Sequence, residues 1–261
     1  MVKILYRNRY LLRELILRDI RVRYVGSIIG LFWSVLNPLL QLALYTAIFS
    51  VVLEVRFSER ATTGQFAEVL FCALLPWAAF QESTTRSSTS FLENSTLIKK
   101  LRFPLEVIPL SVVGSAVIHQ LIGTAIFALI LMYTGSLYLP GLILLPILLG
   151  FQIVMMSGMA LAMSSVNVFF RDVVQVLGVL FMLLFWMTPI VYPKSQAPAV
   201  FQWILDLNPL THMVAAYRFA LLGYPDLATG GVVYWLAFSL VLALVGASIL
   251  KRTRKELVDL V

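Results

Sequence analysis

Six apolar stretches, most of them long enough to cross a lipid bilayer, constrain the fold of this chain more than any other feature of its sequence. A membrane-spanning helix needs about 20 consecutive, predominantly apolar residues. Only 13% of the 261 residues are charged, whereas soluble proteins carry about 25%. We therefore predict an all-α membrane protein with six transmembrane helices. They cover residues 28–53, 66–83, 107–133, 142–164, 173–191 and 232–250.

The second stretch is the weakest of the six, because Glu68 and Pro76 leave only residues 69–80 as an apolar segment. A polar run of Ser, Thr and Arg residues follows at 83–90. Hydrocarbon offers no hydrogen-bond partner to such groups, so this run cannot face lipid. We predict that the second helix continues past residue 83 into water.

The basic residues predict the orientation of the chain. Sixteen of the twenty Lys and Arg residues lie on one side of the six-span pattern: seven before the first span, four after the second, one after the fourth and four after the sixth. Loops with an excess of Lys and Arg stay in the cytoplasm, so both termini are predicted to be cytoplasmic. The net charge of +7 then follows from topology and from attraction to anionic membrane lipids, with no nucleic-acid partner. The four basic residues on the outer side are Arg56, Arg60, Lys194 and Arg218.

Residues 1–27 are predicted to form a cytoplasmic or interfacial segment that precedes a six-helix domain of residues 28–261. Within it, residues 9–23 show the pattern of an amphipathic helix. An Arg-rich polar face suits a helix that lies on the membrane with its apolar side in the acyl boundary. A cytoplasmic helix packed on the protein's own body gives the same pattern, and the two can coexist. The polar face includes Arg13, Glu14, Arg18 and Arg21.

The loop after the second span has the pattern of a short cytoplasmic helix. Asn94 or Ser95 can cap its start, and Pro104 ends it. Such a helix could dock its apolar ridge into a groove of a partner protein. A solvated loop whose charges only obey the positive-inside rule explains the same residues, and the pattern leaves both interpretations open. The ridge consists of Leu97, Ile98 and Leu101, beside Glu93, Lys99 and Lys100.

About forty residues, 192–231, separate the fifth span from the sixth. They are too few for a domain and too apolar for a free loop. Two short helices that break at Asn208 and Pro209 fit this segment, either entering the outer leaflet or lining a vestibule. Breaks at that depth are tolerated only where protein or water covers them.

No nucleotide-binding or catalytic motif occurs in the chain. The patterns G-x-x-x-x-G-K-[ST], H-E-x-x-H and G-x-S-x-G have no match. The two histidines, His119 and His212, do not indicate a zinc site, and a single cysteine, Cys72, excludes a disulfide within the chain. We interpret His119 as a hydrogen-bonded packing residue. We predict no enzyme and no cofactor in this chain; energy for uphill transport would come from another chain.

Aromatic residues number 32, of which 17 are Phe, 10 Tyr and 5 Trp. Most are expected in the belts at the two membrane surfaces. A minority could form surfaces on which sugar rings stack. Belt and channel positions cannot be distinguished for the aromatic residues near span ends, which are Phe32, Trp33, Trp77, Phe80 and Trp186.

Five segments, in order along nearly the whole chain, carry one further pattern. They are Arg18-Asp19 and Arg21 with Tyr24, Gly30-Leu31-Phe32-Trp33 and Asn37-Pro38-Leu39; Asn94 with Leu97-Ile98-Lys99-Lys100, Phe103-Pro104 and Pro109; Asn167-Val168-Phe169-Phe170-Arg171-Asp172; Thr188-Pro189-Ile190-Val191-Tyr192-Pro193; and Leu207-Asn208-Pro209-Leu210 with Tyr217-Arg218. Together they resemble the ABC-2 class of transporter permeases that export bacterial cell-surface polysaccharide, such as O-antigen, capsule and teichoic acid.

The resemblance implies an interfacial N-terminal helix, a coupling helix at about 91–102 and short re-entrant gate helices between the fifth and sixth spans. It also implies that two copies form one channel in the bacterial inner membrane. Two separate ATPase subunits, which bind ATP and Mg, would drive the outward movement of a lipid-linked polysaccharide. The residues that it assigns to coupling are Glu93, Asn94, Leu97, Ile98, Lys99 and Lys100. Those that bracket the external gate are Pro189, Tyr192, Pro193, Asn208 and Pro209.

Two alternatives remain on the sequence alone. An ABC-2 permease for a drug or a small lipid is compatible with the short external loops. A polytopic enzyme that transfers sugars to lipids would need clustered carboxylates or arginines near a membrane face. The sequence has only Arg171-Asp172 and scattered acidic residues there.

Overall fold

The computed structural model describes residues 6–24, 33–52, 63–100, 104–225 and 228–260. All regular secondary structure within these ranges is helical, which confirms the predicted all-α class. In chain order the helices are α2 (Arg9–Tyr24), α3 (Trp33–Tyr45), the π-helical η2 (Thr46–Val52), α4 (Thr63–Glu93), α5 (Ser95–Lys100), α6 (Val107–Thr134), the 3-10 helix η3 (Leu139–Leu144), α7 (Leu145–Phe169), α8 (Val173–Trp186), the 3-10 helix η4 (Lys194–Gln196), α9 (Ala199–Leu207), α10 (Pro209–Leu222) and α11 (Thr229–Leu260).

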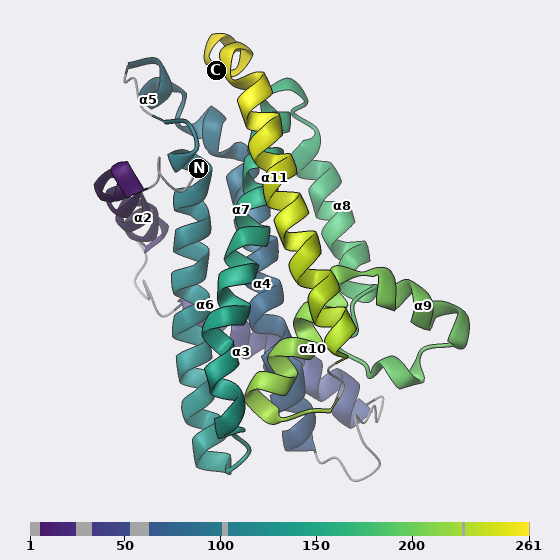
Figure 1. The fold of residues 1–261 in the computed structure, drawn as a ribbon. Helices are drawn as coiled ribbons and strands as arrows, with labels where there is room; N and C mark the ends of the chain where they lie inside the picture. The colour runs from purple at the N-terminus through teal and green to yellow at the C-terminus, as the bar shows by residue number, and fades with distance from the viewer. Residues whose placement is uncertain (1–5, 25–32, 53–62, 101–103, 226–227, 261) are drawn as a thin grey trace.

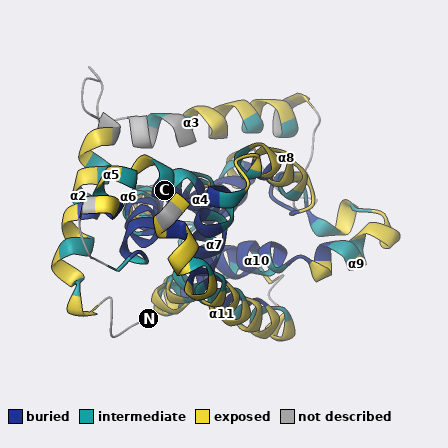
Figure 2. Ribbon diagram, turned by 90° about the horizontal axis from the view of Figure 1, so that it is seen from above, coloured by how far each residue is buried: buried dark blue, intermediate teal, exposed yellow. Residues whose placement is uncertain are grey.

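The long helices form a bundle with α4 and α7 at its centre (Figures 1 and 2). Helix α4 packs against α6, α7, α8 and α10, and α7 also packs against α11. The end of the bundle that carries α5 and the C-terminus is called the α5 end. The opposite half, which holds α10, is called the α10 end. Helix α9 projects sideways from the bundle in both views.

Small residues let the central helices approach closely. A Cβ atom added to Gly246 of α11 would overlap the main-chain carbonyl of Gly158 on α7. A Cβ atom at Gly158 would in turn lie 2.5 Å from the main-chain nitrogen of Ala243. Helices in membranes pack through such contacts between small residues, because lipid provides no hydrophobic force to drive them together.

Three segments are long and apolar enough to cross a membrane: Val107–Thr134, Leu139–Phe169 and Thr229–Val258. They correspond to the predicted third, fourth and sixth spans and confirm a multi-pass membrane protein. The segments of the first and fifth spans contain shorter apolar helices, Leu39–Phe49 and Val173–Trp186. The count of six spans therefore stays a prediction. Residues 28–32 and 53 of the first span lie outside the described ranges.

The fifth helix ends earlier than predicted. Helix α8 stops at Trp186, whereas the apolar pattern extended to residue 191. Pro189 cannot donate a main-chain hydrogen bond, and the Thr188 hydroxyl bonds back to the Leu184 carbonyl at 2.7 Å. The side-chain amide nitrogen of Asn208 donates to the main-chain carbonyl of Met187 at 2.9 Å. These contacts replace the next turn of helix.

Helix α4 continues to Glu93, as predicted, but one face of its polar run is covered by protein rather than by water. The hydroxyls of Ser83, Ser87 and Ser90 donate to carbonyls three residues earlier, at 2.7–3.1 Å. Hydroxyl groups satisfied in this way on their own helix can be buried without a partner from elsewhere. All three side chains are buried against neighbouring helices. The expectation of a helix in water was therefore wrong for this face of α4.

Candidate functional site

Helix α2 packs on the bundle at the α5 end. Leu15 is buried, and Ile16 lies over Gly114 of α6 so closely that a Cβ atom there would be 2.5 Å from the Ile16 Cδ1 atom. Arg13 and Arg21 are exposed on the opposite face. One side of α2 thus packs on the protein's own helices, as the interpretation of a helix packed on the protein body predicted. Its position at a membrane surface stays a prediction.

Polar contacts tie α2 to α4 and to the predicted coupling segment. The guanidinium of Arg86 forms two hydrogen bonds with the Asp19 carboxylate, at 2.6 and 3.0 Å. Arg18 donates to the side-chain oxygen of Asn94 at 2.6 Å. Burial alone would lower the pKa of Arg86, but the hydrogen bonds and charges of Asp19 and Glu82 raise it above its ordinary value. Arg86 therefore stays charged at any physiological pH.

The predicted coupling residues surround the junction of α4 and α5. Glu93 ends α4, and Asn94 connects it to α5, accepting on its carbonyl from the main chain of Leu97 and Ile98 at 3.0 Å. Glu93 and Lys99 are exposed, and Leu97 is partly exposed. The side chain of Lys100 and all of residues 101–103, including Leu101, lie outside the described part of the chain. A coupling role for these residues stays a prediction.

Ile98 points inward rather than toward a partner. Its side chain is 7% exposed and belongs to an apolar cluster with Phe91, Ile108 and Leu250, among others. This cluster joins α4, α5, α6 and α11 at the α5 end. Ile98 is thus part of the support of α5 and cannot form the exposed ridge that the local pattern suggested for it.

His119 has an acidic neighbour that the sequence did not reveal. Its Nδ1 atom lies 4.0 Å from the Glu82 carboxylate of α4. Glu82 also contacts Arg86 at 3.5 Å. The two helices place a carboxylate and an imidazole together although they are far apart in the sequence. A helical-periodicity argument applied to α6 alone could not have found this pair.

Helix α10 is anchored to the bundle by side chains that bond main-chain carbonyls. Asn208 caps its first turn by accepting from the Leu210 main chain at 3.0 Å, and Pro209 occupies the first helical position, where its missing N–H costs nothing. Arg218 is only 4% exposed. It donates to the carbonyls of Ile190 at 2.8 Å and Val69 at 3.3 Å.

A buried amide cluster joins α10 to three other helices. Gln120 and Gln152 donate to each other at 2.9 Å. The Tyr217 hydroxyl donates to Gln152, and Gln152 also donates to the Pro76 carbonyl at 3.1 Å. Gln120 lies within the predicted apolar span 107–133, and no local pattern relates it to Gln152. Isolated Gln residues in apolar spans are the signal that could have suggested such a cluster.

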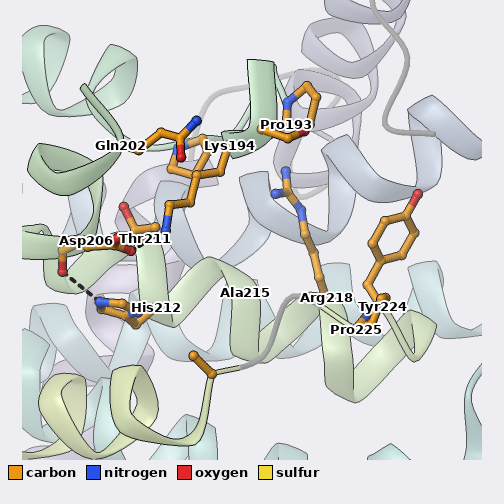
Figure 3. A pocket seen from close by; sticks show the side chains of 13 residues that line it. Pro193, Lys194, Gln202, Asp206, Thr211, His212, Ala215, Arg218, Tyr224 and Pro225 are labelled. Atoms are coloured by element: carbon orange, nitrogen blue, oxygen red, sulfur yellow. Dashed lines mark hydrogen bonds and ion pairs between the residues drawn. The ribbon is translucent and has the colours of Figure 1, made fainter. Parts of the chain in front are cut away.

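A cavity of about 640 Å³ lies at the α10 end (Figure 3). Its walls come from the segment after α8, from α9 and α10, and from the segment after α10. Two of the five predicted gate residues, Pro189 and Pro193, line it. The hydroxyl of a further one, Tyr192, donates to the Trp186 carbonyl at 2.7 Å. Lys194 and Asp206 form an ion pair beside the cavity. The polar lining residues among those that the structure describes are Lys194, Ser195, Gln202, Asp206, Thr211, His212, Arg218 and Tyr224.

The predicted channel aromatics occupy different environments. Trp77 and Phe80 are buried inside a single copy of the chain, where the Trp77 ring centroid lies 6.1 Å from that of Phe181 and the Phe80 centroid 5.7 Å from it. Trp186 is exposed. Phe32 lies outside the described residues, as does the side chain of Trp33. Which of them face a channel stays a prediction.

Comparison with known proteins places these features in a family. The model of the family described as ABC-2 type transporter matches residues 10–222. A Klebsiella pneumoniae protein named O-antigen export system permease protein RfbA is 35% identical over 221 residues, which is 83% of each chain. A Myxococcus xanthus protein of the same name is 28% identical over 99% of this chain and 98% of its own length. The Escherichia coli polysialic acid transport protein KpsM is 26% identical over 93% and 92% of the two chains.

Proposed function

The chain belongs to the ABC-2 type transporter family, and we propose that it is the membrane subunit of an ABC transporter that exports a cell-surface polysaccharide of the O-antigen type. The observation that carries the proposal is the 35% identity to an O-antigen export permease over 83% of both chains. A polysialic acid transporter is also related over 93% of this chain. The named cargo of both relatives is a polysaccharide.

The structure supports a transport subunit that receives its energy from elsewhere. Three helices are long and apolar enough to span a membrane, and the sequence contains no phosphate-binding loop. In this proposal two ATPase subunits bind ATP and Mg and dock at the α5 end. There α5 and the last turns of α11 project from the bundle (Figure 1), with the basic residues Lys251, Arg252 and Arg254 on α11.

The remaining parts of the proposal concern assembly and direction. Two copies of the chain enclose the conduit in the bacterial inner membrane, with both termini in the cytoplasm. The lipid-linked polysaccharide enters from the cytoplasmic leaflet and leaves at the α10 end, past α9 and α10. The charge distribution of sixteen inner to four outer basic residues supports this orientation.

Complementation tests the function directly. The chain is expressed with the ATPase encoded beside it in a strain that lacks its own O-antigen permease but still makes the polymer. We expect polysaccharide at the cell surface, detected with antibody on intact cells, and none when the ATPase is omitted. Polymer that stays inside the cell although both proteins are present, together with gained resistance to small hydrophobic drugs, would instead indicate the drug-permease alternative.

A further inference from the structure

The cavity at the α10 end has the dimensions and the lining of a site for a small polar ligand. Its volume of about 640 Å³ falls within the range of about 300–1,000 Å³ that small-molecule sites occupy. Figure 3 shows Arg218 and Tyr224 on one side of it, facing Gln202, Lys194, Thr211 and His212 on the other. Charged and amide groups therefore project into the same space from different elements.

The charges that line the cavity favour a neutral ligand with many hydroxyl groups. Lys194 is paired with Asp206, so a free anion would meet the carboxylate and a free cation would meet the ammonium. The third charged residue of the lining, Arg218, is only 4% exposed and donates to the main-chain carbonyls of Ile190 and Val69, so little of its guanidinium faces the cavity. A hydrocarbon chain would remove both from water with no compensating bond. Sugar hydroxyls both donate and accept, and they match a set that combines an ammonium, a carboxylate and an amide.

Two further groups support a polar occupant. Gln202 uses its amide nitrogen to hold the Ala197 carbonyl at 2.8 Å, which fixes the side chain at the cavity wall. Thr211 lines the same wall, and its buried hydroxyl has no hydrogen-bond partner among the residues that the structure describes. Buried hydroxyls in proteins nearly always have a partner.

We propose that this cavity binds one sugar ring of the polysaccharide as it leaves the protein, with Asp206 and Gln202 holding ring hydroxyls and Thr211 completing the site. The inference rests on the proposed function for the identity of the ligand. Residues of both α9 and α10 line the cavity; α9 projects from the bundle, whereas α10 lies against it (Figure 2). A ring bound there contacts both elements at once.

Binding is measured on the full-length chain in lipid nanodiscs, by saturation-transfer NMR. The probes are the methyl α-glycosides of D-glucose, D-galactose and D-mannose, titrated through the millimolar range. We expect transfer to the ring protons of at least one glycoside. Asp206→Asn should weaken that binding about five- to tenfold, because a charged acceptor becomes a neutral one. The matched control is Asp172→Asn, which makes the same change on an exposed residue beside α8 at the α5 end and should leave the affinity unchanged.

A second matched pair tests the hydroxyl group. Thr211→Val should weaken glycoside binding about two- to tenfold without lowering the thermal stability of the protein, because the hydroxyl has no partner to lose. Thr84→Val removes another buried hydroxyl without a partner among the described residues, on α4 and away from this cavity. It should leave both binding and stability unchanged.

Three results would overturn the proposal: no saturation transfer to any of the glycosides, equal affinity in the wild type and in both the Asp206→Asn and Thr211→Val proteins, or displacement of the glycoside by inorganic phosphate, which would identify an anion site. These results are independent of the complementation experiment. A chain that restores polysaccharide export but binds no glycoside refutes the sugar site and leaves the function intact. A chain that fails to restore export refutes the function whatever it binds.

Discussion

The two ends of the molecule hold their arginines in opposite ways. At the α5 end, Arg86 and Arg254 lie partly exposed and pair with the carboxylates of Asp19 and Glu106. At the α10 end, Arg218 is buried and donates to the main-chain carbonyls of Val69 and Ile190. The same type of side chain therefore makes partly exposed ion pairs at one end and buried hydrogen bonds at the other. A count of basic residues per loop cannot distinguish these two uses.

The difference has an energetic consequence. Exposed ion pairs contribute about 0–1 kcal/mol to stability, since water and salt screen them. A hydrogen bond to a charged group contributes about 1.5–3 kcal/mol, and the cost rises when a buried partner is left unsatisfied. We therefore expect substitutions of the buried Arg218 to affect folding, and substitutions of exposed residues at the α5 end to affect partner binding.

Replacing Arg218 should have the largest effect on stability. Arg218→Met removes both bonds to the carbonyls of Ile190 and Val69, and we expect a loss of about 3 kcal/mol or more. Arg218→Lys keeps the charge but lacks the planar fork, so its loss should be intermediate. The free energy of unfolding is measured by titration with SDS from mixed micelles. Lys194→Met, at a partly exposed basic residue of the same end, serves as the control and should change the free energy of unfolding by less than about 0.5 kcal/mol.

The two apolar residues of α5 should separate folding from coupling. Ile98→Asp places a carboxylate in the cluster around Phe91 and Leu250, so we expect a loss of about 2–4 kcal/mol in the same titration. Leu97→Asp, on the partly exposed face, should leave stability nearly unchanged but abolish export and reduce co-purification of the ATPase. Burying such a Leu in an interface contributes about 1.5–3 kcal/mol. Normal export and normal ATPase recovery by the Leu97→Asp protein would remove the coupling assignment.

The buried amide cluster should show a smaller and strongly non-additive effect. Gln152→Leu leaves the Gln120 side-chain oxygen without its donor and the Tyr217 hydroxyl without its acceptor, although the Gln120 nitrogen still donates to Tyr217. Hydrogen bonds between membrane helices contribute about 0.6–1.7 kcal/mol. Adding Gln120→Leu removes the second unsatisfied amide, so the double variant should be little worse than Gln152→Leu alone. Additive losses in the SDS titration would show that the two amides act independently, contrary to their reciprocal bonds.

The sequence predicted features that depend on one segment and missed those that depend on two. The apolar stretch 107–133 matches α6, Val107–Thr134, to one residue, because length and apolarity alone decide a membrane helix. The continuation of α4 to Glu93 was predicted, but its burial was not, since burial depends on the helices that pack against it.

The same limit applies to the candidate site. The predicted gate segment does line the cavity at Pro189 and Pro193, whereas the contacts of Arg218 with Val69 and of His119 with Glu82 join residues that no local pattern relates.

The ion pair between α2 and α4 should have the smallest effect, and it tests the comparison most directly. A double-mutant cycle with Asp19→Asn and Arg86→Gln should give a coupling energy of about 0.2–1 kcal/mol in the SDS titration. The energy should fall as salt is raised, because both side chains are partly exposed. Export should decline more than stability if α2 positions Asn94 and α5 for the ATPase, through the bond from Arg18. A coupling energy above about 2 kcal/mol that is insensitive to salt would mean that this pair resembles the buried contacts of Arg218, and the contrast between the two ends would then fail.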